Sequence, residues 1–112
     1  MDAKREVAAA YFTAWNTKNA EVLRPFFTDD VTLEDWDIYA EGLEDVLKAN
    51  QNIFDAVPTI EAIPMMILTD DDNSCAVGVL KIKLPEQTID VIDIIKMNAS
   101  CKITSIKAYR GH

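Results

Sequence analysis

The second half of the chain contains four consecutive segments with the period of a β-strand, each followed or preceded by turn residues. Asp, Asn, Ser, Pro and Gln gather at residues 70–74, 85–87 and 98–100, where they predict turns. A chain that ends in an uninterrupted run of strands favours a sheet of neighbouring antiparallel strands. The predicted strands cover residues 59–69, 75–84, 88–97 and 101–109.

The first part of the chain has helical periodicity. Val7, Tyr11 and Trp15 recur every four residues among good helix formers, which predicts an amphipathic helix over about residues 3–16. A short second helix is expected over residues 20–27, with an irregular end where a proline interrupts it. Tyr11 lies in the middle of the apolar stripe of the first helix, so we expect it to face the interior.

A strand over residues 31–36 separates these helices from a third one. After Gly42, apolar residues follow a helical stripe that only Asn50 interrupts, and the helix is expected to end before Pro58. Three helices and one strand followed by four strands indicate an α+β fold, with the helices gathered on one face of a curved mixed or antiparallel sheet. A pocket is expected between the helices and the concave face of that sheet.

Length and charge limit the possible function. The chain has 112 residues, of which 49% are hydrophobic. This is enough for a single hydrophobic core, so we expect one domain over residues 1–112. The 19 acidic and 11 basic residues give a net charge of -8, and the basic residues are scattered, which argues against nucleic-acid and anionic-membrane partners. The chain shows neither an apolar run of about 18 residues nor an apolar N-terminal segment. A cytoplasmic location is the expectation.

The sequence contains one histidine and two cysteines, and none of them is placed as a catalytic or metal-binding residue would be. The single histidine is His112, the last residue, which is a poor position for catalytic or metal-binding geometry. Cys75 and Cys101 form no CxxC pair and are expected to be free thiols. No metal or other cofactor is expected, and proton chemistry would have to use carboxylates, tyrosines, lysines or thiols.

Two carboxylates occupy strand faces that are otherwise apolar. Strand alternation places Asp93 on the face of Val91 and Ile95, and it places Asp35 on the face of Leu33. An ionised carboxylate removed from water without a partner costs roughly several kcal/mol. Such a group is therefore neutral, paired or retained for chemistry. Taken singly, each acid, like Tyr11, could also be a structural residue with satisfied hydrogen bonds.

The order of the elements resembles the NTF2-like (SnoaL-like) superfamily, whose cystatin-like α+β fold is a cone of curved sheet closed by three helices around a hydrophobic pocket. Within it, three segments resemble the bacterial Δ5-3-ketosteroid isomerases. They are residues 11–16 (YFTAWN), residues 27–35 (FTDDVTLED) and residues 92–97 (IDIIKM). The spacing from Tyr11 to Asp35 agrees with that family without a gap.

The resemblance implies a cofactor-free isomerisation of a hydrophobic ketone through an enolate. In that family's division of roles, Asp35 would be the base that moves the proton, while Tyr11 and a protonated Asp93 would hydrogen-bond the enolate oxygen. The sequence departs from the family at Asn50, where a tyrosine supports the oxyanion tyrosine, and at Arg110, where an aromatic pocket residue is usual. Asn50 is expected to be able to hydrogen-bond Tyr11 instead. The substrate-binding residues are expected to be Trp15, Asn50, Phe54, Met65, Leu80, Ile95, Ile106 and Ala108.

Other functions remain open on the sequence. The same acids could serve a SnoaL-like cyclase or an epoxide hydrolase, and the latter needs an arginine between two acids, for which Arg110 is the candidate. A non-catalytic module that binds a small hydrophobic molecule or dimerises is the third possibility. A homodimer is expected through the outer face of the sheet, with Val77, Val79, Ile92 and Ile94 in the interface.

Overall fold

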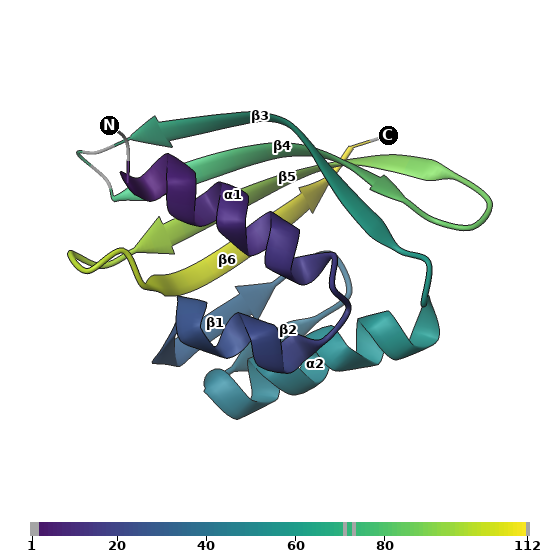
Figure 1. Ribbon diagram of the computed structural model, residues 1–112, viewed down its shortest axis with the longest axis horizontal. Coiled ribbons are helices and arrows are strands. Elements are labelled where there is room, and N and C mark those ends of the chain that lie inside the picture. Colours follow the sequence, from purple (N-terminus) through teal and green to yellow (C-terminus); the bar gives the residue numbers. More distant parts are fainter. Residues whose placement is uncertain (1–2, 71, 73, 112) are drawn as a thin grey trace.

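One curved six-stranded sheet and three helices make up the structure, a computed structural model that describes residues 3–70, 72 and 74–111 (Figure 1). The helices are α1 (Ala3–Trp15), the 3-10 helix η1 (Ala20–Phe26) and α2 (Leu43–Ala56). The strands are β1 (Phe27–Glu34), β2 (Tyr39–Glu41), β3 (Glu61–Asp70), β4 (Cys75–Lys83), β5 (Thr88–Met97) and β6 (Ile103–Arg110). Asp71 and Asn73 of the first predicted turn, and His112, lie outside the described residues.

The sheet has the strand order β2-β1-β6-β5-β4-β3. The last four strands pair as antiparallel neighbours, as their turn-separated pattern predicts. β1 pairs with β6 in parallel, with Leu33 opposite Ile106, so the sheet is mixed. The three-residue β2 is missing from the sequence prediction because so short a segment has no readable period. The N-terminal half of the sheet is therefore joined to the C-terminal half through the last strand.

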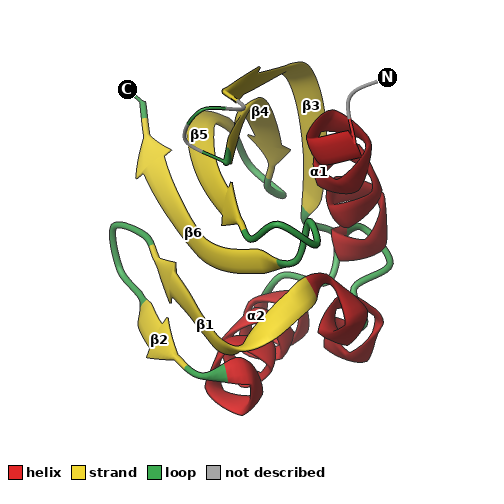
Figure 2. Cartoon of the chain, turned by 90° about the vertical axis from the view of Figure 1, so that its left-hand side faces the viewer, coloured by secondary structure: helices red, strands yellow, loops and turns green. Residues whose placement is uncertain are grey.

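The helices cover the concave face of the sheet. Figure 2 shows the sheet curling around, with α1 against the β3 and β4 side and α2 below β1 and β2. The side chain of Asn16, just after α1, pairs with the backbone of Ala62 on β3, because its Nδ2 donates to the carbonyl at 2.8 Å and its Oδ1 accepts from the amide at 2.8 Å. These two bonds tie the end of α1 to the edge strand, so the helix is fixed over the sheet.

The inward face of the central strands carries Asp93, as strand alternation predicts. Asp93 lies opposite Gly78 of β4 and Ala108 of β6. A side chain at position 78 would bring its Cβ to 2.6 Å from the ring of Phe12, so glycine makes room for that ring beside the carboxyl. The neighbouring residue on this face, Ile95, is fully buried at 0% exposure. The acid thus projects from the interior surface of the sheet.

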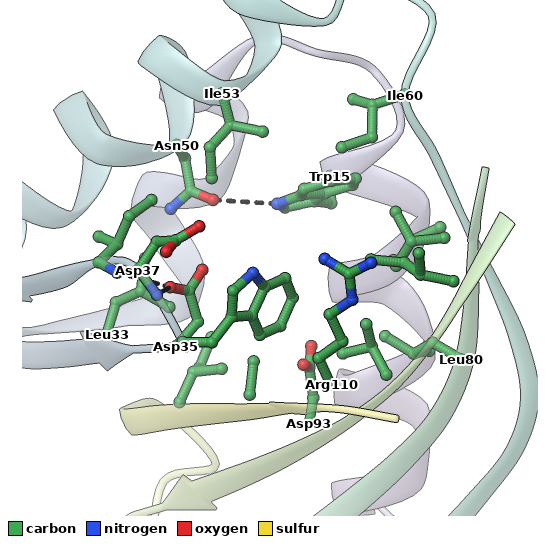
Figure 3. A pocket seen from close by; sticks show the side chains of 18 of the residues that line it. Trp15, Leu33, Asp35, Asp37, Asn50, Ile53, Ile60, Leu80, Asp93 and Arg110 are labelled. Carbon is green, nitrogen blue, oxygen red and sulfur yellow. Dashed lines mark hydrogen bonds between the residues drawn. The ribbon is translucent and has the colours of Figure 1, made fainter. Parts of the chain in front are cut away.

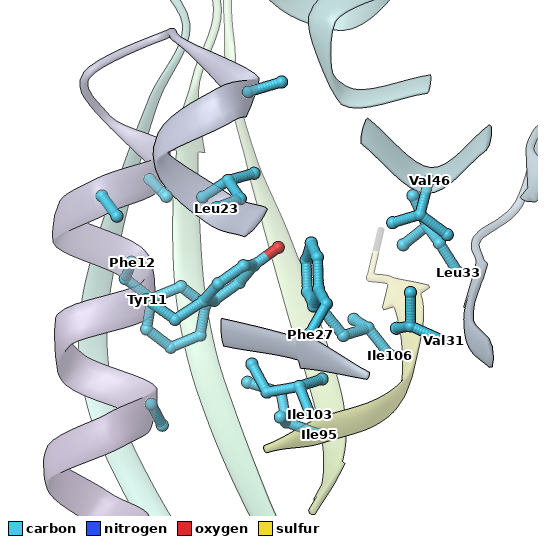
Figure 4. Packing of buried hydrophobic residues seen from close by; sticks show 14 of the residues in the cluster. Tyr11, Phe12, Leu23, Phe27, Val31, Leu33, Val46, Ile95, Ile103 and Ile106 are labelled. Carbon is cyan, nitrogen blue, oxygen red and sulfur yellow. The ribbon is translucent and has the colours of Figure 1, made fainter. Parts of the chain in front are cut away.

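A cluster of aromatic rings holds Tyr11 in the core (Figure 4). The Tyr11 ring lies 5.5 Å from that of Phe12, 6.0 Å from that of Phe26 and 5.8 Å from that of Phe27. Tilted and edge-on contacts of this kind add to the free energy gained by burying the rings. The tyrosine side chain is therefore held from both the helix and the first strand, which restricts the position of its hydroxyl group.

The prediction that Met65 lines the pocket is wrong. Met65 lies on β3 and is 61% exposed, and its neighbour Met66, expected in the core, is 53% exposed. The pairing of β3 with β4 shifts between Pro64 and Met66, so Met65 is the extra residue of a β-bulge. Strict alternation along the strand fails at this point, which is why the sequence pattern misplaces both side chains.

Candidate active site

A cavity of about 330 Å³ lies between α1, α2 and the concave face of the sheet. This volume is at the lower end of the range for small-molecule sites. Most of its wall is apolar, and the polar groups are few. Its charged lining residues are Asp35, Asp37, Asp93 and Arg110, and Tyr11 and Asn50 add neutral polar groups. Figure 3 shows Asp35, Asp93 and Arg110 directed into this space, with Trp15 across from them.

Tyr11 reaches the cavity from α1. Its side chain is only 3% exposed, but it is part of the cavity lining. In the part of the chain that the structure describes, its hydroxyl makes no hydrogen bond and is not sealed off as a buried unsatisfied group. Burial and, to a lesser degree, the charge of Asp93 raise the pKa of Tyr11. The hydroxyl therefore keeps its proton near neutral pH and is free to donate it in a hydrogen bond.

Asp93 reaches the same cavity from β5. Burial raises the pKa of its carboxyl to about 7, and the negative charge of Asp35 contributes to the shift. No hydrogen bond or ion pair to the Asp93 carboxyl occurs among residues 3–70, 72 and 74–111. A large share of this carboxyl is thus protonated at neutral pH, and a protonated carboxyl can donate a hydrogen bond.

Asp35 lies in a turn rather than in a strand. The predicted strand over residues 31–36 is wrong at its end, because β1 stops at Glu34. The Oδ1 atom of Asp35 accepts hydrogen bonds from the backbone N–H groups of Asp37 at 2.7 Å and Ile38 at 2.6 Å, which closes a tight turn. Both bonds use the same oxygen, so the turn orients the carboxylate while Oδ2 stays available at the cavity wall.

Asn50 hydrogen-bonds Trp15 and not Tyr11. Its Oδ1 accepts from Trp15 Nε1 at 2.9 Å, and its Nδ2 donates to the carbonyl of Val46 at 2.9 Å (Figure 3). The expected hydrogen bond from Asn50 to Tyr11 is therefore absent, because the Oδ1 and Nδ2 atoms of Asn50 bond to Trp15 and Val46. Phe54 packs edge-on against Trp15 with ring centres 4.9 Å apart. These contacts hold the indole as a fixed part of the cavity wall.

The other predicted binding residues divide into two groups. Trp15, Asn50, Leu80, Ile106 and Ala108 line the cavity. Phe54, Ile95 and Met65 do not, because the first two are buried behind the wall and the third faces outward. Sequence reasoning missed Ile82, Ile89 and Val91, although strand alternation with Leu80 and Asp93 places them on the same face. The missed lining residues Trp36, Asp37 and Ile38 belong to the turn after Asp35, whose shape no periodicity reveals.

The chain matches a known protein family over most of its length. A family model described as a SnoaL-like domain matches residues 8–106, which span α1 to the middle of β6. The chain belongs to the SnoaL-like domain family. A search of curated proteins finds no match.

Solved structures agree with the fold of this SnoaL-like chain. An NTF2-like protein of unknown function from Cytophaga hutchinsonii is 14% identical, with 99% of this chain and 92% of that chain covered and a TM-score of 0.81. The epoxide hydrolase/cyclase-like enzyme SalBIII, which takes part in pyran ring formation in salinomycin, is 19% identical over 96% and 90% of the two chains, with a TM-score of 0.84. A candidate ketosteroid isomerase from Kribbella flavida is 17% identical over 97% and 78%, with a TM-score of 0.83. The expected NTF2-like α+β fold is confirmed.

Within the described ranges, no group of three or more His, Cys, Asp and Glu side chains is arranged to hold a metal ion. Among these same residues, no helix combines the length and apolar character needed to cross a bilayer.

Proposed function

We propose that this SnoaL-like protein is a cofactor-free isomerase that moves a proton on a hydrophobic ketone through an enolate intermediate. Asp35 is the base that removes the proton next to the carbonyl and returns it to another carbon. Tyr11 and protonated Asp93 donate hydrogen bonds to the oxygen that becomes negative in the enolate. No atom is gained or lost in the reaction, since one C–H bond is broken and another is formed.

The proposal depends chiefly on one observation, which is that two carboxyls in the same cavity have different surroundings. Asp93 projects from the inward face of β5, where burial of its carboxyl raises the pKa to about 7. Asp35 accepts two backbone hydrogen bonds at a turn, both on Oδ1, which leaves Oδ2 without a hydrogen bond from the described residues. Two acids in environments of unequal polarity can divide into a donor and a base, which is the arrangement that enolisation requires.

A β,γ-unsaturated ketone provides the direct assay. We expect the protein to convert a β,γ-unsaturated ketosteroid, or the smaller cyclohex-3-enone, to the conjugated enone, whose ultraviolet absorbance can be followed continuously. The smaller ketone is included because the cavity of about 330 Å³ is modest. A rate equal to that of buffer with both ketones would contradict the proposed isomerase.

An epoxide hydrolase or cyclase is the second candidate, and the position of Arg110 is what favours it. Epoxide opening by paired acids needs an arginine between them, and Arg110 lines the cavity together with Asp35 and Asp93. Incubation with a hydrophobic epoxide, followed by analysis for the diol, separates it from the isomerase.

We further propose a cytoplasmic homodimer formed through the outer face of the sheet. Ile92 is 43% exposed on this face, and Val77, Val79 and Ile94 are half-buried beside it in the single chain. Met66, Leu68 and Tyr109 are the strand partners of Val79, Val77 and Ile92. They extend the apolar surface on the same face of the sheet. Light scattering is expected to give twice the mass of 12.6 kDa, and a monomer at micromolar concentration would refute the dimer.

A further inference from the structure

Arg110 is the one basic side chain among the described residues that line the cavity. It comes from β6, where it lies opposite Val91 on the inward face of the sheet. Figure 3 shows its guanidinium directed into the cavity, in the region between Asp93 and Trp15. The cavity therefore has one positive side chain, at an exposed residue, beside charged lining residues that are otherwise acidic.

This guanidinium has no partner within the described part of the chain. No hydrogen bond or ion pair joins Arg110 to Asp35, to Asp37 or to any other described residue. Arg24 shows how this chain satisfies a structural arginine, since it contacts Glu44 at 2.7 Å and Glu21 at 2.9 Å. All five N–H donors of Arg110 remain available for a ligand.

The position of Arg110 relative to the oxyanion site follows from the strand register. Asp93 lies opposite Ala108, and Arg110 is two residues further along β6 on the same face. Two residues of a strand span about 7 Å. The two side chains thus start from nearby points on one face of the sheet, so a single ligand can contact Asp93 with one group and Arg110 with another.

We propose that the cavity binds a hydrophobic keto acid, with its ketone oxygen at Tyr11 and Asp93 and its carboxylate paired with Arg110. This inference depends on the proposed enolisation only for the placement of the ketone. A planar guanidinium matches a carboxylate through two parallel N–H···O bonds, which fix the ligand's direction as well as its charge. A phosphate group carries more negative charge than a carboxylate, and the described lining residues include no second cation to balance it.

The acids in the cavity enforce the orientation. Asp35 and Asp37 lie in the turn after β1, so an anion placed near either of them is repelled. Among the described lining residues, Arg110 supplies the positive charge with which a ligand carboxylate can pair. A carboxylate that pairs with Arg110 is held by the guanidinium, and Asp35 stays available to the carbon next to the ketone.

Two naphthalene probes test this arrangement. The phenol oxygen of 2-naphthol stands in for the enolate oxygen, and 6-hydroxy-2-naphthoate adds a carboxylate at the far end of the same rings. Their dissociation constants are measured by titration calorimetry with the wild-type protein, with Arg110→Gln and with the control Lys107→Gln. The control makes the same charge change on β6 at a side chain that lies by Glu34 at 3.6 Å, not in the cavity.

We expect Arg110→Gln to weaken binding of 6-hydroxy-2-naphthoate about ten-fold, because the charge-assisted hydrogen bonds between the guanidinium and the carboxylate are lost. Binding of 2-naphthol should change less than about two-fold, and Lys107→Gln should leave both constants unchanged. Equal affinity of wild type and Arg110→Gln for the carboxylate probe overturns the anion site. If the carboxylate probe binds through Arg110 but 2-naphthol does not bind, the anion site stands and the oxyanion role of Tyr11 and Asp93 fails. If neither probe binds, both are overturned.

Discussion

Replacing Asp35 with asparagine is expected to lower kcat for the β,γ-unsaturated ketone by about 10²–10⁴-fold, the usual contribution of a positioned general base. An amide cannot take the proton from carbon. The asparagine Oδ1 can still accept the two backbone hydrogen bonds that close the turn at Asp37 and Ile38, so the local structure should persist. The measurement is the enone absorbance assay on the purified variant, with circular dichroism to verify folding.

Glu34→Gln is the matched control for this variant. Glu34 is the preceding residue, but it faces outward and lies 3.6 Å from Lys107. Glu34→Gln removes one negative charge at the residue next to the base, as Asp35→Asn does at the base itself. A general electrostatic effect would therefore lower the rates of both variants alike. We expect only the Asp35 variant to lose activity, with kcat rather than KM carrying the loss. Full activity of Asp35→Asn would remove this residue from the role of base.

Asp93→Asn is expected to stabilise the protein at pH 8 and to have little effect near pH 4. The pKa of this carboxyl is about 7 in the folded protein against an ordinary value of 3.8. Below pH 3.8 both states hold the proton, and between the two values only the folded state holds it, so wild-type stability falls as pH rises through this window. Each unit of difference corresponds to about 1.4 kcal/mol, so the gain at pH 8 is a few kcal/mol.

Denaturant unfolding at several pH values measures this effect. The control is Asp90→Asn, because Asp90 lies on the same strand but is exposed and paired with Lys81. That variant should gain no stability as pH rises and should lose the small contribution of a surface ion pair. A gain for Asp93→Asn that is independent of pH, or equal to that of Asp90→Asn, would mean that the buried carboxyl does not carry a raised pKa.

The two variants also differ in what they should do to catalysis. Asparagine at position 93 retains an N–H donor, so it can still hydrogen-bond an enolate oxygen, though more weakly than a carboxylic acid. Asparagine at position 35 retains no basic group. The structure therefore leads us to expect a variant that is more stable and moderately less active at position 93, and one that is folded and nearly inactive at position 35.

Several parts of the fold could be predicted because their signals are local. The stripe through Tyr11 predicts α1, and the alternation around Asp93 predicts both β5 and the inward direction of the acid. The turn-rich residues between strands predict the antiparallel order of the last four strands. In each case the period of the helix or strand decides which side chains share a face. That period can be recognised from the pattern of apolar and polar residues within a few positions of the chain.

Other features depend on partners that are distant in the chain. The side chain of Asn50 could have turned to Tyr11, but the amide meets Trp15, which is 35 positions away. Met65 fits the alternation of its strand in the sequence, but it faces solvent because a bulge shifts the pairing of β3 with β4. Parallel pairing of β1 with β6 likewise joins strands from opposite ends of the chain. No local pattern contains these contacts.

The sequence by itself determined the α+β class, the helices that cover the sheet and the three polar groups, Tyr11, Asp35 and Asp93, that lie among apolar residues. The tertiary structure alone decided that these groups line one cavity, that Asn50 supports the indole of Trp15, and that Arg110 enters the cavity without a partner among the described residues. The reason is physical. Residue periods fix the direction of a side chain, whereas the pKa of a carboxyl and the partner of a guanidinium depend on which distant groups are packed around them.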